Sequence, residues 1–191
     1  MKGIFAKISS LFGGRAFSST PKVRSDRSFF SFQHTGHVLR AEEILRQNGL
    51  EVEVMGPPPA MRTGCDMVLV CAAVLEPKII RLLAQANIHP EEVRPVSSEL
   101  LEPVSLFQVK DLGQWFMVRA ANMKITVAKE QGIIVNVSGG GCPDVPYLAD
   151  LLLGQSIATS AEPRLSGQTL CSYALQKAFV EARRLWLKNP G

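Results

Sequence analysis

Met67-Val68-Leu69-Val70-Cys71 is an unbroken apolar run, and it predicts a strand that is buried on both faces. A strand of this kind lies in the middle of a sheet, so its neighbours must come from the segments on either side. Three further strands are predicted around it, at residues 29–32, 52–55 and 93–96. Apolar side chains at helical spacing predict two helices between these strands, at residues 35–46 and 77–86. The order βαββαβ predicts a ferredoxin-like sandwich over residues 28–97.

The second half of the chain predicts a smaller α+β domain over residues 114–189. Residues 98–113 are interpreted as a linker with one short helical piece. A hairpin or meander of three strands is expected next, at residues 115–120, 124–128 and 133–137. A helix over 144–153 and a long final helix that ends near Leu187 complete the domain. The fold class of the whole chain is therefore α+β, with two domains.

Gly139-Gly140-Gly141-Cys142-Pro143 follows the last of these strands. Three consecutive glycines cost conformational entropy, so a geometric reason is expected for them. Backbone N–H groups that lead into a helix can hold an anion, and the same field favours a thiolate. The loop therefore predicts Cys142 as a reactive cysteine whose anion is stabilised by the N–H groups of Gly139, Gly140 and Gly141. A tight turn that merely contains a cysteine is the alternative.

Cys65 closes a second loop, which follows three prolines at 57–59. Gly64 can supply a positive φ, and Arg62 offers a cationic donor to a thiolate. Asp66 opposes a low thiol pKa. The alternative is a buried cysteine at the start of a strand, because free cysteine behaves as a small hydrophobe.

The pattern of cysteines and histidines does not indicate a metal site. No two of the cysteines form a C-x-x-C pair, and the histidines do not complete a ligand set; these residues are Cys65, Cys71, Cys142, Cys171, His34, His37 and His89. No cofactor is indicated either. Four cysteines without a secretory signal favour reduced thiols in the cytoplasm.

The basic charge of the chain is concentrated before residue 27. The formal net charge is +4, but five of the 21 basic residues precede Asp26, which leaves 16 against 17 acidic residues. The folded part is thus near neutral, and nucleic acid is not an expected partner. Residues 1–27 are interpreted as a flexible basic amphipathic tail, whose residues 1–15 can contact a membrane surface weakly. An organelle-targeting peptide and a tail without a role are the alternatives.

Four short segments of the first domain carry a recognisable pattern. They lie at 30–32, 34–42, 57–59 and 63–65, and they read Phe-Ser-Phe, His-Thr-Gly-His-Val-Leu-Arg-Ala-Glu, Pro-Pro-Pro and Thr-Gly-Cys. On these segments the domain resembles a small bacterial domain family of selenium/sulfur carrier-like proteins. The resemblance covers about a third of the chain, and it matches Cys65 to the family cysteine. The second domain resembles an extension found with some family members. Cys142-Pro143 is also similar to the Cys-Pro dipeptide at the acceptor thiol of small sulfur-carrier proteins.

The resemblance implies a sulfur or selenium carrier that relays a chalcogen on a cysteine. Cys65 would be the primary acceptor, and Cys142 a second acceptor or a resolving thiol. The implied partners are donor or acceptor proteins of sulfur or selenium metabolism. A non-enzymatic ligand-binding or regulatory module with structural cysteines is the alternative. A thiol enzyme is a third hypothesis, but no histidine follows His89, so the base for Cys142 would have to come from the first domain.

Overall fold

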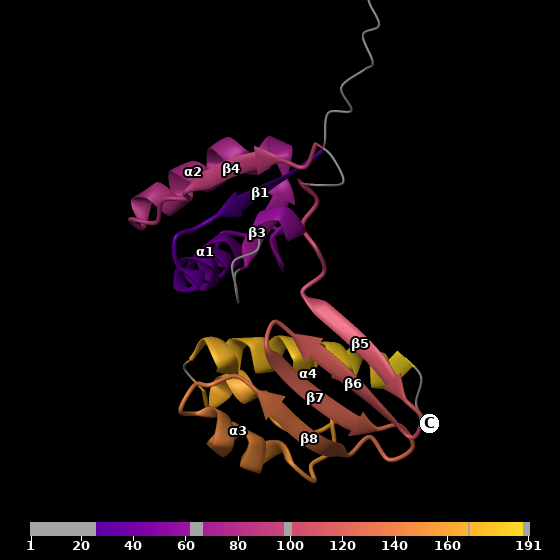
Figure 1. Ribbon diagram of the computed structural model, residues 1–191. Coiled ribbons are helices and arrows are strands. Elements are labelled where there is room, and N and C mark those ends of the chain that lie inside the picture. The colour runs from indigo at the N-terminus through magenta and orange to yellow at the C-terminus, as the bar shows by residue number, and fades with distance from the viewer. Residues whose placement is uncertain (1–25, 62–66, 98–100, 168, 189–191) are drawn as a thin grey trace, which may run out of the picture.

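A computed structural model describes residues 26–61, 67–97, 101–167 and 169–188 of the chain. The first domain is a four-stranded antiparallel sheet with the order β2-β3-β1-β4, carrying two helices (Figure 1). Its elements are β1 (Arg27–Ser31), α1 (Thr35–Gln47), β2 (Glu53–Met55), β3 (Val68–Ala72), α2 (Glu76–Gln85) and β4 (Glu92–Pro95). This strand order is the one that a split βαβ unit produces, so the predicted ferredoxin-like sandwich is confirmed.

Strand β3 is buried on both faces, as its apolar run predicts. Leu69 and Cys71 lie on the face that carries the helices and belong to the main core. Val68 and Val70 face the other way and pack with Phe29 in a smaller cluster. Because successive side chains of a strand point to opposite faces, both faces need apolar residues here.

Helix α1 is held by one apolar stripe. Val38, Ala41 and Leu45 are fully buried and face the sheet, as their spacing predicts. The helix ends before Gly49, which has a φ of +71° and is suited to the left-handed turn that follows. His34 occupies the N-cap position, but its side chain makes no capping hydrogen bond.

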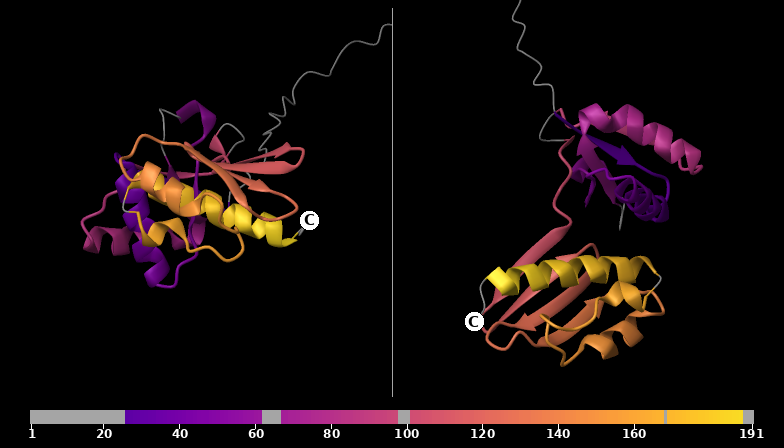
Figure 2. Two further views of the ribbon diagram at one scale, coloured as in Figure 1. Left: turned by 90° about the horizontal axis from the view of Figure 1, so that it is seen from below. Right: turned by 180° about the vertical axis from the view of Figure 1, so that it is seen from behind.

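The second domain is a four-stranded antiparallel meander with the order β5-β6-β7-β8. Its elements are β5 (Phe107–Leu112), β6 (Trp115–Ala120), β7 (Met123–Ala128), β8 (Ile134–Gly139), α3 (Val145–Leu152) and α4 (Leu170–Lys188). Short 3₁₀ turns also occur at Pro59–Met61, Ala73–Leu75 and Pro163–Leu165. The helix α4 lies across the sheet and packs on β6 and β7 (Figure 2).

Strand β5 differs from the sequence prediction, which interpreted residues 98–113 as a linker. The strand pairs with β6 along its whole length, from Phe107 opposite Ala120 to Leu112 opposite Trp115. Before it, Val104 forms a β-bridge with Gly56 of the first domain, through N–H···O bonds of 2.9 and 3.0 Å. The connection is therefore short and is tied to both domains.

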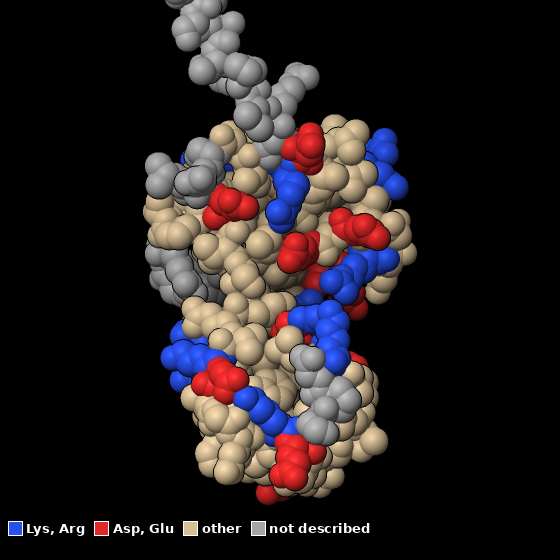
Figure 3. All heavy atoms as spheres, turned by 90° about the vertical axis from the view of Figure 1, so that its right-hand side faces the viewer, with Lys and Arg blue, Asp and Glu red and all other residues tan. Residues whose placement is uncertain are grey.

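Lys and Arg side chains are interspersed with Asp and Glu side chains on the face shown in Figure 3. No helix within the described part of the chain is both long and apolar enough to cross a membrane. The predicted tail at residues 1–27 lies almost wholly outside the described residues.

Candidate functional site

Two glycines at the end of β8, Gly139 and Gly140, are required by close contacts. Gly139 and Gly140 have φ values of +97° and +72°. A Cβ on Gly139 would lie 2.0 Å from the backbone oxygen of Asn122. A Cβ on Gly140 would lie 2.7 Å from Met123 Sδ and 2.8 Å from Cys171 Sγ. The loop therefore passes directly over Cys171, and only glycine leaves room for that sulfur.

Cys142 lies at the end of this loop, and its thiol is half-buried. Its carbonyl accepts a hydrogen bond of 3.2 Å from the N–H of Val145, the first residue of α3. A Cβ on Gly141 would meet no atom within 4 Å. The Cys142 thiol is thus placed just before α3, at a position that remains in part accessible to solvent.

Cys142 faces the first turn of α4, where Cys171 is buried at 4 % exposure. The Cys171 thiol donates to Cys142 Sγ, and this bond is the main reason why the pKa of Cys142 is lowered. The hydroxyl of Thr169 and the backbone N–H of Cys171 lower that pKa further. Partial burial and the nearby Asp144 carboxylate act in the opposite direction. The balance lowers the pKa of Cys142, so its thiolate forms more readily than that of an ordinary cysteine.

The pKa of Cys171 moves the other way. Burial raises it, and the hydrogen bond to Cys142 raises it further because that bond keeps the proton on Cys171. The backbone N–H groups of Gly141 and Cys142 point to the Cys171 sulfur and lower its pKa in part. In the pair, Cys171 is therefore the donor and Cys142 the acceptor.

Thr169 fixes the helix end that carries Cys171. It stands immediately before α4, and its Oγ1 accepts a hydrogen bond of 3.2 Å from the N–H of Ser172. Its hydroxyl donates to Asp144 Oδ1 at 2.7 Å, and its N–H donates to Asp144 Oδ2 at 3.3 Å. Because a hydroxyl has a single proton, Asp144 and Cys142 compete for it. Asp144 thus joins the start of α3 to the start of α4 beside the two thiols.

The structure does not describe the second predicted site, the loop that ends at Cys65. Cys65, Gly64 and Arg62 lie outside the described residues, so the structure tests none of them. Cys71 is described and is buried in β3. Desolvation, with a smaller contribution from the Glu76 carboxylate, raises its pKa to about 11. Cys71 is therefore a core residue that stays protonated.

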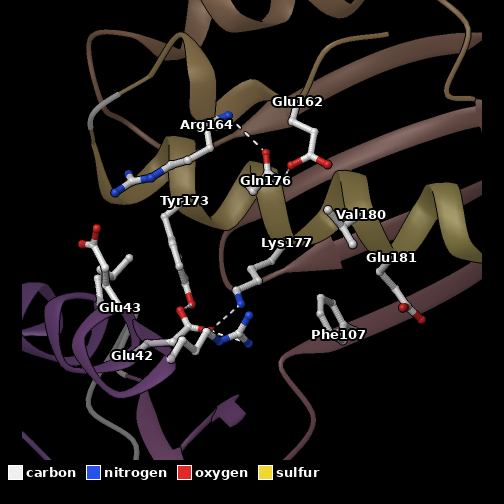
Figure 4. A pocket seen from close by; sticks show the side chains of 12 residues that line it. Glu42, Glu43, Phe107, Glu162, Arg164, Tyr173, Gln176, Lys177, Val180 and Glu181 are labelled. Carbon is white, nitrogen blue, oxygen red and sulfur yellow. Dashed lines mark hydrogen bonds and ion pairs between the residues drawn. The ribbon is translucent and has the colours of Figure 1, made fainter. Parts of the chain in front are cut away.

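A pocket of 610 Å³ lies between the domains and is lined by α1, α4 and Phe107 (Figure 4). Glu42 of α1 is 5 % exposed and is the centre of its polar contacts. The Glu42 carboxylate accepts bonds from Tyr173 Oη at 2.5 Å and from Lys177 Nζ at 2.7 Å, and pairs with Arg46 at 2.9 Å. These contacts join the domains, because Glu42 belongs to the first domain while Tyr173 and Lys177 belong to the second.

A smaller pocket of 410 Å³ lies beside the first one, and Leu39, Glu43 and Arg164 line both pockets. The lining of the smaller pocket includes Gly36 and Arg40 near the start of α1, and Arg164, Thr169 and Leu170 around the start of α4. Thr169 also contacts Cys142. The boundary between the domains therefore reaches Thr169, which neighbours Cys142.

The sequence singled out Cys142 and the glycines but interpreted Cys171 only as a core residue of the final helix. The burial is confirmed, whereas the contact with Cys142 was missed. Thr169 was missed as well, although a threonine before an apolar helix is a capping signal. Within the described ranges, no group of three His, Cys, Asp or Glu side chains gathers as a metal site.

Comparisons with known proteins cover both domains. The family described as "Putative Se/S carrier protein-like" matches residues 28–95, and a domain of unknown function (DUF8182) matches residues 106–190. An uncharacterized protein of the archaeon Methanocaldococcus jannaschii, MJ0011, is 36% identical over 189 residues. The match covers 96% of this chain and 95% of that protein. No solved structure matches the chain.

Proposed function

The chain belongs to the family of the Methanocaldococcus jannaschii protein and contains a Se/S carrier protein-like domain, and we propose that it accepts sulfur or selenium on Cys142 and passes it to a partner protein. The partners are a donor and an acceptor protein of sulfur or selenium metabolism. Cys65 is the second candidate acceptor, because the sequence resemblance matches it to the family cysteine. The role of a carrier requires a nucleophilic thiol that another protein can reach.

One observation carries this proposal: Cys142 is half-buried and its pKa is lowered by donors from the start of α4. A thiolate attacks the outer sulfur of a donor persulfide, and the donor leaves as a thiolate. The new persulfide on Cys142 is then attacked at its outer sulfur by an acceptor thiolate, and Cys142 leaves as a thiolate. Both steps conserve sulfur and electrons, and each is favoured by a stable Cys142 anion.

The experiment is intact mass spectrometry after loading. The purified protein is incubated with a cysteine desulfurase and cysteine, or with a selenocysteine lyase and selenocysteine, in the absence of oxygen. We expect the chain to gain one sulfur or one selenium atom that a reductant removes. Cys142→Ser should lose this adduct, Cys65→Ser tests the other candidate, and Cys71→Ser is the control with a buried cysteine.

Two results would argue against this function. In the first, the adduct is absent from the wild type as well as from every variant. In the second, it persists in the Cys65→Ser, Cys142→Ser double variant. In the second case the acceptor would have to be Cys71 or Cys171, both of which are buried.

The pocket between the domains favours one alternative, a ligand-binding module. Its lining carries both signs of charge, with Glu43 and Glu181 against Arg164 and Lys177. Such a lining suits a ligand that is itself both cationic and anionic, such as a free amino acid. Thermal denaturation with a panel of amino acids would test this function, and an increase in Tm that Arg164→Gln removes would support it. No increase for any amino acid would reject this alternative.

A further inference from the structure

Cys142 and Cys171 form a dithiol site, and we infer that Cys171 releases the chalcogen from loaded Cys142 as sulfide or selenide when no acceptor protein has taken it. This inference rests on the proposed function, because it concerns the persulfide on Cys142. It adds a second reacting residue, which the sequence interpretation assigned to the core. The product is a chalcogen at the −2 oxidation level, together with an intramolecular disulfide between Cys142 and Cys171.

The position of Cys171 decides which sulfur it attacks. Its thiol already donates to Cys142 Sγ, and this atom becomes the inner sulfur once a persulfide has formed. Because Cys142 is partly exposed whereas Cys171 is buried, we place the outer sulfur on the solvent side of Cys142. Attack on the inner sulfur is therefore the reaction that the contact prepares, and transfer of the outer sulfur onto Cys171 is not.

The reaction balances without an external oxidant. The Cys171 sulfur bonds to Cys142 Sγ, and the bond from Cys142 Sγ to the outer sulfur breaks. The outer sulfur leaves with the bonding electron pair and with the proton of Cys171, as HS⁻. The Cys171 sulfur is oxidised, and the outer sulfur is reduced by the same amount. A dithiol reductant, supplied by another protein, then returns the disulfide to two thiols.

The surroundings of Cys171 suit a nucleophile that reacts only internally. The residue is only 4 % exposed, so reagents from solvent reach its thiol poorly. Burial keeps it protonated at rest. The N–H groups of Gly141 and Cys142 point to the same sulfur and stabilise the negative charge that develops during attack. Gly140 has no side chain that would separate the loop from Cys171, since its Cβ would lie 2.8 Å from that sulfur.

The two thiols also belong to elements that can approach each other. Cys142 is carried by the loop after β8, whereas Cys171 is fixed in the first turn of a helix of 19 residues. A disulfide needs a smaller separation than a hydrogen-bonded thiol pair, so one partner has to move. Gly141 has no Cβ, and one placed there would meet no atom within 4 Å, so the backbone of the loop can change its dihedral angles at this residue.

The test follows the fate of the adduct in the full chain. The protein is loaded with inorganic polysulfide without oxygen, the excess is removed, and intact mass and free sulfide are followed with time. In the wild type, the gain of one sulfur atom should give way to the loss of two hydrogen atoms, with one sulfide released per chain. Cys171→Ser retains a hydroxyl donor for Cys142 and should keep the adduct at least about tenfold longer. Cys71→Ser, the matched buried cysteine, should behave as the wild type.

A second probe, glutathione disulfide, tests Cys171 without a persulfide. We expect a mixed disulfide at Cys142 that the wild type converts to the internal disulfide with release of glutathione. Peptide mapping should locate the new bond between Cys142 and Cys171. In Cys171→Ser the glutathione adduct should persist.

The outcomes separate the two proposals. If the wild type holds its sulfur atom as long as Cys171→Ser, and holds the glutathione adduct as well, Cys171 is not a resolving thiol. If polysulfide loads neither protein while glutathione is still displaced by Cys171, the carrier function fails and the dithiol site stands. Disulfide formation between Cys142 and Cys65 would also contradict the inference.

Discussion

Cys71 and Cys142 are two thiols in two domains, and their surroundings give them opposite properties. Cys71 lies inside β3, where burial raises its pKa to about 11. Cys142 follows β8 and receives bonds from Cys171 and Thr169 that lower its pKa. Neither residue has a nearby lysine or arginine among the causes of its shift. The comparison teaches that neutral donors at a helix start, and not a cationic neighbour, make the difference.

The largest expected effect is a difference in labelling rate. At pH 8, a thiol with the pKa of Cys71 is only about 0.1% ionised, and it is also buried. We expect iodoacetamide to label Cys142 at least about 100-fold faster than Cys71, as measured by peptide mass spectrometry of the folded protein. Equal rates for the two thiols would remove the basis of the comparison.

The next effect concerns the loop that sets Cys142 in place. Gly140→Ala should lower the free energy of unfolding by about 3 kcal/mol, because its Cβ meets two sulfurs and the φ is +72°. Gly113→Ala is the matched control, with a φ of +75° and nothing within 4 Å. It should cost only about 1 kcal/mol. Urea denaturation measures both, and equal losses would show that the contact with Cys171 is not tight.

A third change affects the contact between the two domains. Glu42→Gln removes the charge that pairs with Lys177 and Arg46, and we expect a loss of about 2 kcal/mol of stability. Its exposed neighbour provides the control, and Glu43→Gln should change stability by less than about 0.5 kcal/mol. The labelling rate of Cys142 should stay the same in both variants. A faster rate in Glu42→Gln alone would mean that the first domain controls access to the thiol.

The smallest effect is on the pH dependence of labelling. The pKa of Cys142 is lowered, so the labelling rate should rise with a midpoint below the value of about 8.5 that is ordinary for a thiol. Cys171→Ala removes the main donor and should move this midpoint upward, whereas Cys171→Ser should move it less. Labelling rates measured from about pH 6 to about pH 10 give the midpoint for each protein. Identical midpoints in all three proteins would reject the donor role of Cys171.

The sequence predicted most of the elements because their apolar periods are strong. Val38, Ala41 and Leu45 follow the helical period, and the run at 67–71 has no polar residue. Strand β5 was missed because it is an edge strand in which all residues after Phe107 are exposed. Lys110 and Asp111 in its second half are typical of a linker, and only pairing with β6 makes the segment a strand.

The site was predicted in part, for a physical reason. The glycines and Cys142 are adjacent in sequence, so their local chemistry could be interpreted directly. Cys171 is 29 positions further along, and helical periodicity places it in the core without indicating what it faces. The N–H donors expected from the glycines for Cys142 differ as well: the N–H of Gly141 points to Cys171, while Gly139 and Gly140 are needed for close packing.

Helix α4 connects the thiol pair to the contact between the two domains. Cys171 lies in its first turn, and Lys177, which holds Glu42 of the first domain, follows six residues later. At a rise of about 1.5 Å per residue, the two points are separated by about 9 Å along one rigid rod. A displacement of the first domain that this contact transmits would therefore act on α4 close to the thiol pair.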